Sequence, residues 1–308
     1  MISLNNEHKL VITGAGGWLG TELLEKLLEE HGPEKIINNV VCLGSHSRTK
    51  TLSDGTEIPV QLFTDSIEIQ DVAGFVHLAF LTRDKVATYG TEDYSFRNLA
   101  ITSRAIELIE QIRPRWIATV SSGAVFSKPG GPLENILTAN PYGFTKRVEE
   151  TMLTQVAQEI GANISIGRLW GAMGSFMPVN RAYAVSDFIV QAHSAQQISI
   201  RANHEVWRRY CDAGEFMEVL ITAAENLKKT SFDSGGELIE LGNLATTISS
   251  LMDANTLVSR PNSSGNADRY FPEATQYESL CNELQIHQKK LVDIIRSTLS
   301  GHLAQLTR

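Results

Sequence analysis

The chain has few cysteines. Its 308 residues include three, Cys42, Cys211 and Cys281, which are far apart and odd in number. Secreted disulfide scaffolds use even sets of cysteines, so we expect reduced thiols in a cytoplasmic protein. The eight histidines show no HExxH or other paired-ligand spacing, and we expect no metal site.

An excess of basic charge and long apolar runs are also missing. Lysine and arginine total 27 against 35 acidic residues, for a net charge of −8. This balance argues against nonspecific nucleic-acid binding, although it permits a local basic pocket for a phosphorylated substrate. No apolar run approaches the ~20 residues that span a bilayer, and the first residues do not resemble a signal peptide. We therefore expect neither a nucleic acid nor a membrane as partner.

The first half alternates short apolar runs with amphipathic stretches, which predicts an α/β fold with a doubly wound parallel sheet. The expected strands are 9–13, 39–43, 60–63, 75–79, 116–120 and 163–169, and the expected helices are 19–30, 92–112 and 142–160. After residue 169 the alternation breaks down. A helix at 213–227 and a strand at 237–241 are expected to return to the sheet, and the tail holds helical patterns around a polar loop at 260–268. We predict a dinucleotide-binding domain of residues 1–169 with 211–243, and a smaller, partly discontinuous substrate lobe of 170–210 and 244–308.

A glycine-rich turn follows the first strand. Gly14, Gly17 and Gly20 form a GxxGxxG pattern directly before a helix. Such glycines allow a tight turn, close approach of the backbone to a pyrophosphate, and close helix packing, while the helix start, here Trp18 and Leu19, offers N–H groups. The pattern predicts a dinucleotide site; a glycine-rich turn without a ligand is the alternative.

The end of the second strand bears on the cofactor. NAD enzymes usually place an acid there for the ribose 2′-hydroxyl, but this chain has Gly44, followed by Ser45 and Arg48. Because Arg48 can pair with a 2′-phosphate, NADP(H) is favoured and NAD(H) remains possible. The alternative is that Arg48 is a solvated loop cation.

Tyr142 and Lys146 lie four residues apart, so on a helix they share a face. A nearby ammonium favours the phenolate, which would lower the phenol pKa from about 10. YxxxK alone is common by chance, but the predicted fifth strand, upstream of it, ends in Ser121 and Ser122.

Together these motifs resemble the extended short-chain dehydrogenase/reductase superfamily, in its NAD-dependent epimerase/dehydratase family. The resemblance implies a Rossmann-type fold and a Ser122, Tyr142 and Lys146 triad, with Gly123 also at the substrate. Residues 76–79 resemble the family's hHLAA stretch, which places Leu78 and Ala79 beside the adenosine and ribose. The resemblance also assigns roles to three further positions. Asp65 is expected to bind the adenine, Asn98 to stabilise the surroundings of the lysine, and Arg208 to bind a nucleotide diphosphate. The alternatives are a solvated turn residue, an exposed helical Asn and a surface cation cluster.

Departures from the family narrow the expected activity. Gly123-Ala124 replaces the Asp-Glu pair of dehydratases, which argues against dehydration, and Arg168 lacks the usual Asn shortly after it. The resemblance implies a 4-keto reductase or epimerase acting on a nucleotide-linked sugar, and a homodimer formed through the helices that contain Asn98 and Tyr142. Two alternatives stay open: a reductase of a non-nucleotide carbonyl substrate, and a non-catalytic dinucleotide sensor.

Overall fold

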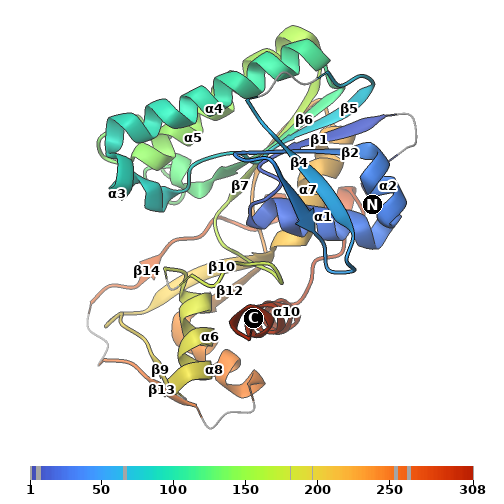
Figure 1. Cartoon of the computed structure of the whole chain (residues 1–308). Helices are drawn as coiled ribbons and strands as arrows, with labels where there is room; N and C mark the ends of the chain where they lie inside the picture. Colours follow the sequence, from blue (N-terminus) through green and yellow to red (C-terminus); the bar gives the residue numbers. More distant parts are fainter. Residues whose placement is uncertain are drawn as a thin grey trace. The chain divides into compact units, whose positions relative to one another are not determined.

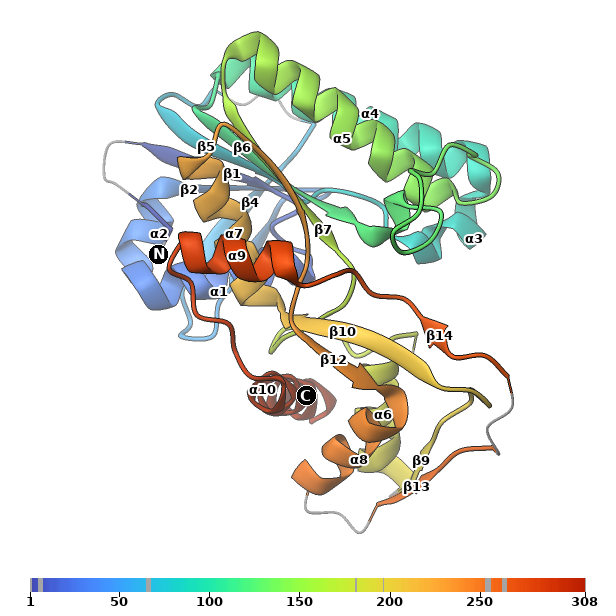
Figure 2. The same ribbon diagram turned by 180° about the vertical axis from the view of Figure 1, so that it is seen from behind.

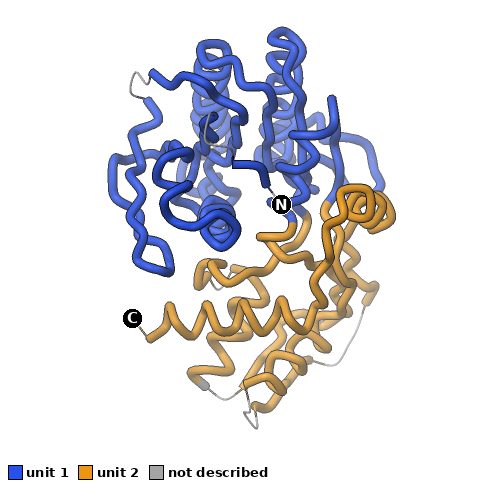
Figure 3. Tube along the Cα trace, turned by 90° about the vertical axis from the view of Figure 1, so that its right-hand side faces the viewer, with its two compact units in different colours: residues 1–169, 216–233 blue, residues 170–215, 234–308 orange. Residues whose placement is uncertain are grey.

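The computed structural model describes residues 2–4, 8–64, 68–180, 182–195, 197–252, 256–261 and 265–307. The chain forms two compact units (Figure 3). Unit 1 comprises residues 1–169 and 216–233, and unit 2 comprises residues 170–215 and 234–308. The chain therefore leaves unit 1 after residue 169, returns for one helix and one strand, and leaves again.

Unit 1 is built on an eight-stranded sheet in the order β11-β7-β6-β5-β1-β2-β4-β3. All neighbours are parallel except β3, which is antiparallel to β4. In chain order, the strands are β1 Lys9–Thr13, β2 Val40–Gly44, β3 Arg48–Thr51, β4 Glu57–Leu62, β5 Val72–His77, β6 Trp116–Ser122, β7 Asn163–Leu169 and β11 Lys229–Asp233. The predicted doubly wound parallel sheet is confirmed.

Helices cover both faces of this sheet (Figures 1 and 2). On one face lie α4 Thr91–Ile112 and α5 Pro141–Ile160, and on the other lie α1 Trp18–His31, α2 Pro33–Asn39 and α7 Ala213–Asn226. The helices α4 and α5 bury their apolar stripes against the sheet, where Leu108, Ile109 and Leu153 have no exposed surface. The loop after β5 carries the short helices η1 Arg83–Lys85 and α3 Val86–Tyr89, and η2 Gly123–Val125 follows β6.

Two of the sequence predictions differ from the structure at the sheet edges. The strand at 237–241 does not return to the large sheet: β12 Glu237–Glu240 pairs antiparallel with β10 Val206–Asp212 in unit 2. The edge position belongs to β11, which was missed because Phe232 is its one buried side chain, so it lacks an apolar pattern. The antiparallel β3 was missed for the same reason, since all four of its residues are polar.

Unit 2 is organised around β10. Besides β12, this strand pairs in parallel with β14 Asp268–Arg269 and β8 Ala172–Met173, while β9 Gln197–Ser199 pairs with β13 Leu257–Ser259. Its helices are α6 Ala184–Ala195, α8 Leu241–Leu251, α9 Thr275–Glu283 and α10 Leu291–Leu306. A separate apolar core includes Phe188, Ile248 and Ile295. In the part of the chain that the structure describes, no helix is long and apolar enough to cross a membrane. All three cysteines are free and buried.

Candidate functional site

The carboxyl ends of three central strands meet at one edge of the large sheet. The register aligns Thr13 of β1 with His77 of β5, and His77 with Thr119 of β6, three residues before Ser122. In parallel α/β sheets this edge is where ligands bind. The predicted glycine-rich turn begins directly after β1, and the predicted catalytic hydroxyl, that of Ser122, lies at the end of β6.

The glycine-rich turn leaves no room for side chains at two of its glycines. Gly14 has a φ of +71°, and a Cβ there would lie 2.7 Å from the Ala79 nitrogen and the Leu78 carbonyl carbon. A Cβ on Gly20 would lie 2.7 Å from the Ala15 backbone. The turn at Gly14 is therefore closely packed against residues 78–79, and the start of α1 is closely packed against Ala15.

The start of α1 presents an uncompensated positive end. The helix begins at Trp18 and Leu19, its N-cap is Gly17, and its first turn contains no acidic residue. Among the described residues, no side chain accepts a hydrogen bond at this cap. Because the helix dipole favours an anion here, the turn fits the pyrophosphate of a dinucleotide.

Arg48 lies beside this turn. Its guanidinium Nη2 donates to the Gly16 carbonyl over 3.3 Å, and the side chain is exposed. The neighbouring Ser45 hydroxyl is 2.9 Å from His46 Nδ1. The loop after β2 thus offers a cation and a hydroxyl next to the predicted phosphate site, whereas Asp65 lies outside the described residues.

Ser122 and Tyr142 come together. Ser122 ends β6, is 8% exposed, and accepts a hydrogen bond from the Ala124 amide over 3.2 Å. Asn140 caps α5 by accepting from the Gly143 amide, and its own amide donates to the Ala124 carbonyl, both over 3.0 Å. These bonds tie the start of α5 to the turn after β6, and the Ser122 side chain is a partner that lowers the pKa of the Tyr142 phenol.

The expected lowering of the Tyr142 pKa by Lys146 is wrong for this structure. Burial raises the pKa of Tyr142, and the Glu149 carboxylate raises it further. The hydrogen bond to Ser122 and the positive charge of Arg83 offset part of that increase. The phenol is therefore held in its protonated form.

Lys146 is directed to other partners. Its Nζ lies 2.7 Å from Glu149 Oε2 and donates to the Val120 carbonyl over 2.9 Å. It also lies 3.7 Å from the centroid of the Phe80 ring, which meets the Tyr142 ring edge-on at 6.0 Å. Lys146 is only 5% exposed. The Glu149 carboxylate, the Val120 carbonyl and the Phe80 ring therefore take the place of water around its ammonium group.

Asn98 stabilises the loop that carries Phe80. It is fully buried in α4, and its Oδ1 accepts a hydrogen bond from the Leu81 amide over 2.7 Å. The Tyr94 hydroxyl donates to the Leu81 carbonyl over 2.7 Å. The alternative of an exposed helical Asn is therefore excluded, and Asn98 acts on the surroundings of Lys146 through the 80–81 loop.

His77 extends the buried polar cluster toward the glycine turn. Thr13 Oγ1 accepts from the Leu78 and Ala79 amides over 3.2 and 3.4 Å and lies 2.8 Å from His77 Nδ1. With both lone pairs of the hydroxyl occupied, its proton points to Nδ1, and a neutral His77 carries its own proton on Nε2. That nitrogen faces Glu149 Oε1 at 3.4 Å. Burial, and then Lys146, lower the pKa of His77 to about 3.

Sequence reasoning missed Glu149 and the role of His77. Glu149 is 1% exposed and lies three residues after Lys146, a spacing at which helical side chains can pair. That spacing was an available signal. Glu150, next to it, instead forms two hydrogen bonds with Arg168 of β7, at 2.9 and 2.8 Å.

Arg208 lies in unit 2. Its guanidinium Nη2 is 2.7 Å from Asp268 Oδ2, and its guanidinium carbon Cζ is 5.6 Å from the centroid of the Tyr270 ring. The adjacent Arg209 donates to the carbonyls of Pro272 and Gly236. Arg208 is thus paired rather than a free surface cation, and its predicted phosphate contact would have to replace Asp268.

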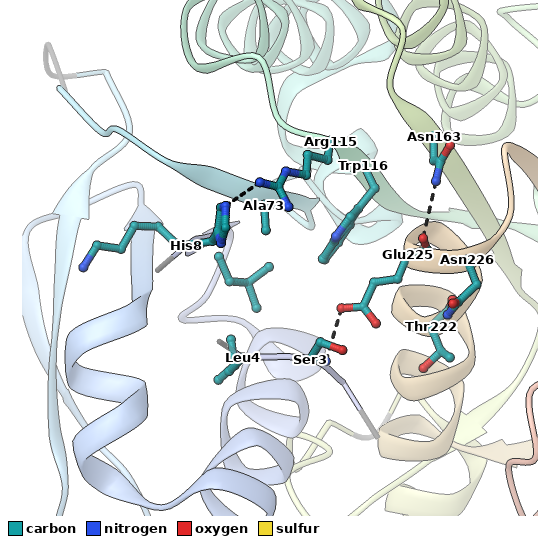
Figure 4. A pocket seen from close by; sticks show the side chains of 12 residues that line it. Ser3, Leu4, His8, Ala73, Arg115, Trp116, Asn163, Thr222, Glu225 and Asn226 are labelled. Carbon is teal, nitrogen blue, oxygen red and sulfur yellow. Dashed lines mark hydrogen bonds between the residues drawn. The ribbon is translucent and has the colours of Figure 1, made fainter. Parts of the chain in front are cut away.

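A pocket of about 520 Å³ lies at the opposite edge of the large sheet (Figure 4). It is lined at the strand starts by Lys9, Trp116 and Asn163, and from α7 by Glu225, whose pKa burial raises to about 7. This is the amino-terminal edge, away from Thr13, His77 and Ser122, so the pocket is not the candidate site. Within the described residues, no group of three or more His, Cys, Asp or Glu could hold a metal ion.

Comparisons with known proteins agree with this architecture. A family model described as the NAD dependent epimerase/dehydratase family matches residues 10–235, and the chain belongs to this family. UDP-glucuronic acid decarboxylase 6 of Arabidopsis thaliana is 24% identical over 235 residues, which cover 70% of this chain and 66% of that protein. The chain therefore matches just under two thirds of that relative's length.

Solved structures share the fold. A UDP-N-acetylglucosamine 4-epimerase from Methanobrevibacter ruminantium M1, in complex with UDP-N-acetylmuramic acid, superposes with a TM-score of 0.79 at 18% identity, covering 98% of this chain and all of that one. A UDP-glucose 4-epimerase from Brucella ovis in complex with NAD gives a TM-score of 0.72 at 16% identity, covering 96% and 98%. The resemblance read from the motifs is confirmed at the level of family and fold.

The contacts and burial of His77 predict the protonation state and tautomer of its ring. We expect its ring to stay neutral, with the proton on Nε2, from pH 8 down to about pH 4 in long-range ¹H–¹⁵N NMR spectra, because burial holds its pKa near 3. The unfolded chain takes up this proton below about pH 6.5, so His77 reduces the free energy of unfolding only as the pH falls from there toward 3. A His77→Gln variant identifies the resonances, and a ring that titrates between pH 6 and 7 would contradict the assignment.

Proposed function

We propose that the chain is a nicotinamide-dependent oxidoreductase that transfers a hydride at a carbon of a nucleotide-linked sugar, as a 4-keto reductase or an epimerase. Unit 1 binds the cofactor and unit 2 binds the substrate. The free, buried cysteines favour a cytoplasmic location. The observation that carries the proposal is the tie between the start of α5, which carries Tyr142, and the turn after Ser122 at the carboxyl edge of the sheet that also bears the glycine-rich turn.

The cofactor, when bound, supplies or accepts the hydride at its nicotinamide ring. Gly14, Gly17 and Gly20, with the amides at the start of α1, hold its pyrophosphate. Ser122 donates a hydrogen bond to the substrate oxygen and orients it. Tyr142 gives a proton to that oxygen when a ketone is reduced and removes it when an alcohol is oxidised.

The substrate class follows from the relatives and from unit 2. Proteins similar to this chain include one named as acting on UDP-glucuronic acid and one solved with a UDP-sugar derivative. Arg208 has the planar guanidinium suited to a diphosphate. If a bound diphosphate replaced the Asp268 carboxylate as its partner, Arg208 would still form charge-assisted hydrogen bonds. Reduction of a non-nucleotide carbonyl would use the same Ser122 and Tyr142 and is the second candidate.

Replacement of Tyr142 by phenylalanine tests the chemistry. We expect turnover, followed as NAD(P)H absorbance with a panel of UDP- and dTDP-sugars and their 4-keto forms, to fall by about 10²–10⁴-fold because the proton donor is gone. The affinity for the dinucleotide should change little. Wild-type turnover in the Tyr142→Phe variant would remove Tyr142 from the mechanism.

The choice of cofactor turns on Arg48. Because β2 ends in Gly44 without a carboxylate and Arg48 lies at the glycine turn, we propose that NADPH binds more tightly than NADH and that the protein purifies largely free of cofactor. Arg48→Ala should cost NADPH binding about 1.5–3 kcal/mol in isothermal titrations and leave NADH binding unchanged. Arg201→Ala, at an arginine whose side chain is 76% exposed, is the matched control. Stoichiometric NAD that does not exchange would favour the epimerase with NAD instead.

We also propose a homodimer formed through α4 and α5. Phe96 on α4 is 73% exposed, an unusual position for a large apolar side chain, and a second copy would cover it. Phe96→Asp should convert a dimer into a monomer at micromolar concentration in sedimentation equilibrium. A wild-type protein that sediments as a monomer would refute the dimer.

A further inference from the structure

Glu149 is a buried carboxylate at the candidate site to which the proposed hydride transfer gives no role. It is 1% exposed, and its two oxygens face different groups: Oε2 lies 2.7 Å from Lys146 Nζ, and Oε1 lies 3.4 Å from His77 Nε2. Both His77 Nε2 and Glu149 Oε1 are buried and have no hydrogen-bond partner among the described residues. Burying a carboxylate costs desolvation free energy unless a nearby opposite charge or hydrogen-bond donors compensate it.

The proton positions around Glu149 indicate that it is ionised. Thr13 favours the Nε2–H tautomer of His77, and Nε2 lies 3.4 Å from Oε1 without forming a hydrogen bond. Lys146 presents an ammonium to Oε2. Burial raises the pKa of Glu149, while Lys146 acts in the opposite direction. The ammonium at Oε2 therefore favours the ionised carboxylate, because a carboxylate accepts its proton and forms an ion pair with it.

We propose that Glu149 is a positioning residue that holds the Lys146 ammonium against β6 and neutralises its charge, so that Tyr142 rests as a neutral phenol poised to donate its proton. The Val120 carbonyl and the Phe80 ring complete the cradle for the ammonium. The inference rests on the proposed function in that it assigns Tyr142 the proton-transfer role. Its consequence is a site biased toward reduction, in which the phenol gives up a proton, over alcohol oxidation, which needs the phenolate.

Several charged or titratable groups lie near Glu149 and the Tyr142 phenol. A test must distinguish the effect of Glu149 from the effects of these groups. Toward Glu149 these are Lys146 and Glu150 on its own helix, His77 on β5 and Tyr94 on α4. Toward the phenol they are Glu149 and Arg83. Loss of the Glu149 charge leaves Arg83 acting on the phenol and leaves the Lys146 ammonium, four residues after Tyr142 on the same helix, without its ion-pair partner, which favours the phenolate.

Titration of tyrosine ionisation tests the proposal without turnover. The chain has seven tyrosines, so the signal of Tyr142 is the difference in phenolate absorbance between a protein and the same protein carrying Tyr142→Phe. We expect the midpoint to lie above pH 10 in the wild-type background. In Glu149→Gln and Glu149→Met backgrounds it should fall by at least about one pH unit. Glu150→Gln, which removes the adjacent carboxylate paired with Arg168, is the matched control and should leave the midpoint in place.

The outcomes are distinct. An unchanged or raised midpoint in a folded Glu149 variant, or a wild-type midpoint below pH 10, would overturn the role of Glu149. If neither variant folds, the wild-type midpoint decides the matter. Failure of the proposed function shows up separately, as absence of dinucleotide binding and of hydride transfer in the wild-type protein. In an active enzyme, Glu149→Gln should also shift the pH profile of alcohol oxidation to lower pH. The substrate KM should stay near its wild-type value. Simple destabilisation of the fold would not change the pH profile while leaving KM unchanged.

Discussion

The in-register parallel pairing of β1, β5 and β6 is the constraint on which the candidate site depends. It brings Thr13, His77 and Ser122 to the same edge of the sheet, although Thr13 and Ser122 are more than a hundred residues apart in the chain. The glycine turn follows β1 directly, and its close approach to residues 78–79 is possible only because Gly14 has no side chain. The glycine-rich turn proposed to bind the cofactor and the hydroxyl proposed to be catalytic are therefore positioned by one set of backbone hydrogen bonds.

Electrostatics then decide what the site can do. A chain with a net charge of −8 places a buried ammonium, a buried carboxylate and a neutral imidazole next to a phenol. The ammonium and the carboxylate pair at 2.7 Å, so the positive charge that would favour phenolate is largely compensated. The resting site resembles a proton donor more than a proton acceptor, which agrees with a reductase.

Most of the fold could be predicted from the sequence, because apolar strands and amphipathic helices leave periodic patterns. Among the exceptions are β3 and β11, edge strands with polar or mixed residues, and β12, whose alternation does not reveal which strand it pairs with. Ser122, Tyr142 and the glycines could be located by motif and spacing. The direction taken by the Lys146 side chain could not, since it depends on Glu149 and on the Val120 carbonyl from a strand more than twenty residues away.

Binding of a dinucleotide to the turn at Gly17 is the measurement that tests the account most directly. Gly17 has ordinary backbone angles, and an added Cβ would lie 3.3 Å from the Gly14 carbonyl oxygen, so Gly17→Ala should fold while its methyl group obstructs a pyrophosphate. In calorimetric titrations with NADH and NADPH, we predict one site per chain in the wild-type protein and at least about tenfold weaker binding in the variant, equivalent to 1.4 kcal/mol. Equal affinity in the two proteins, at equal melting temperatures, would contradict the assignment of this edge of the sheet as the cofactor site.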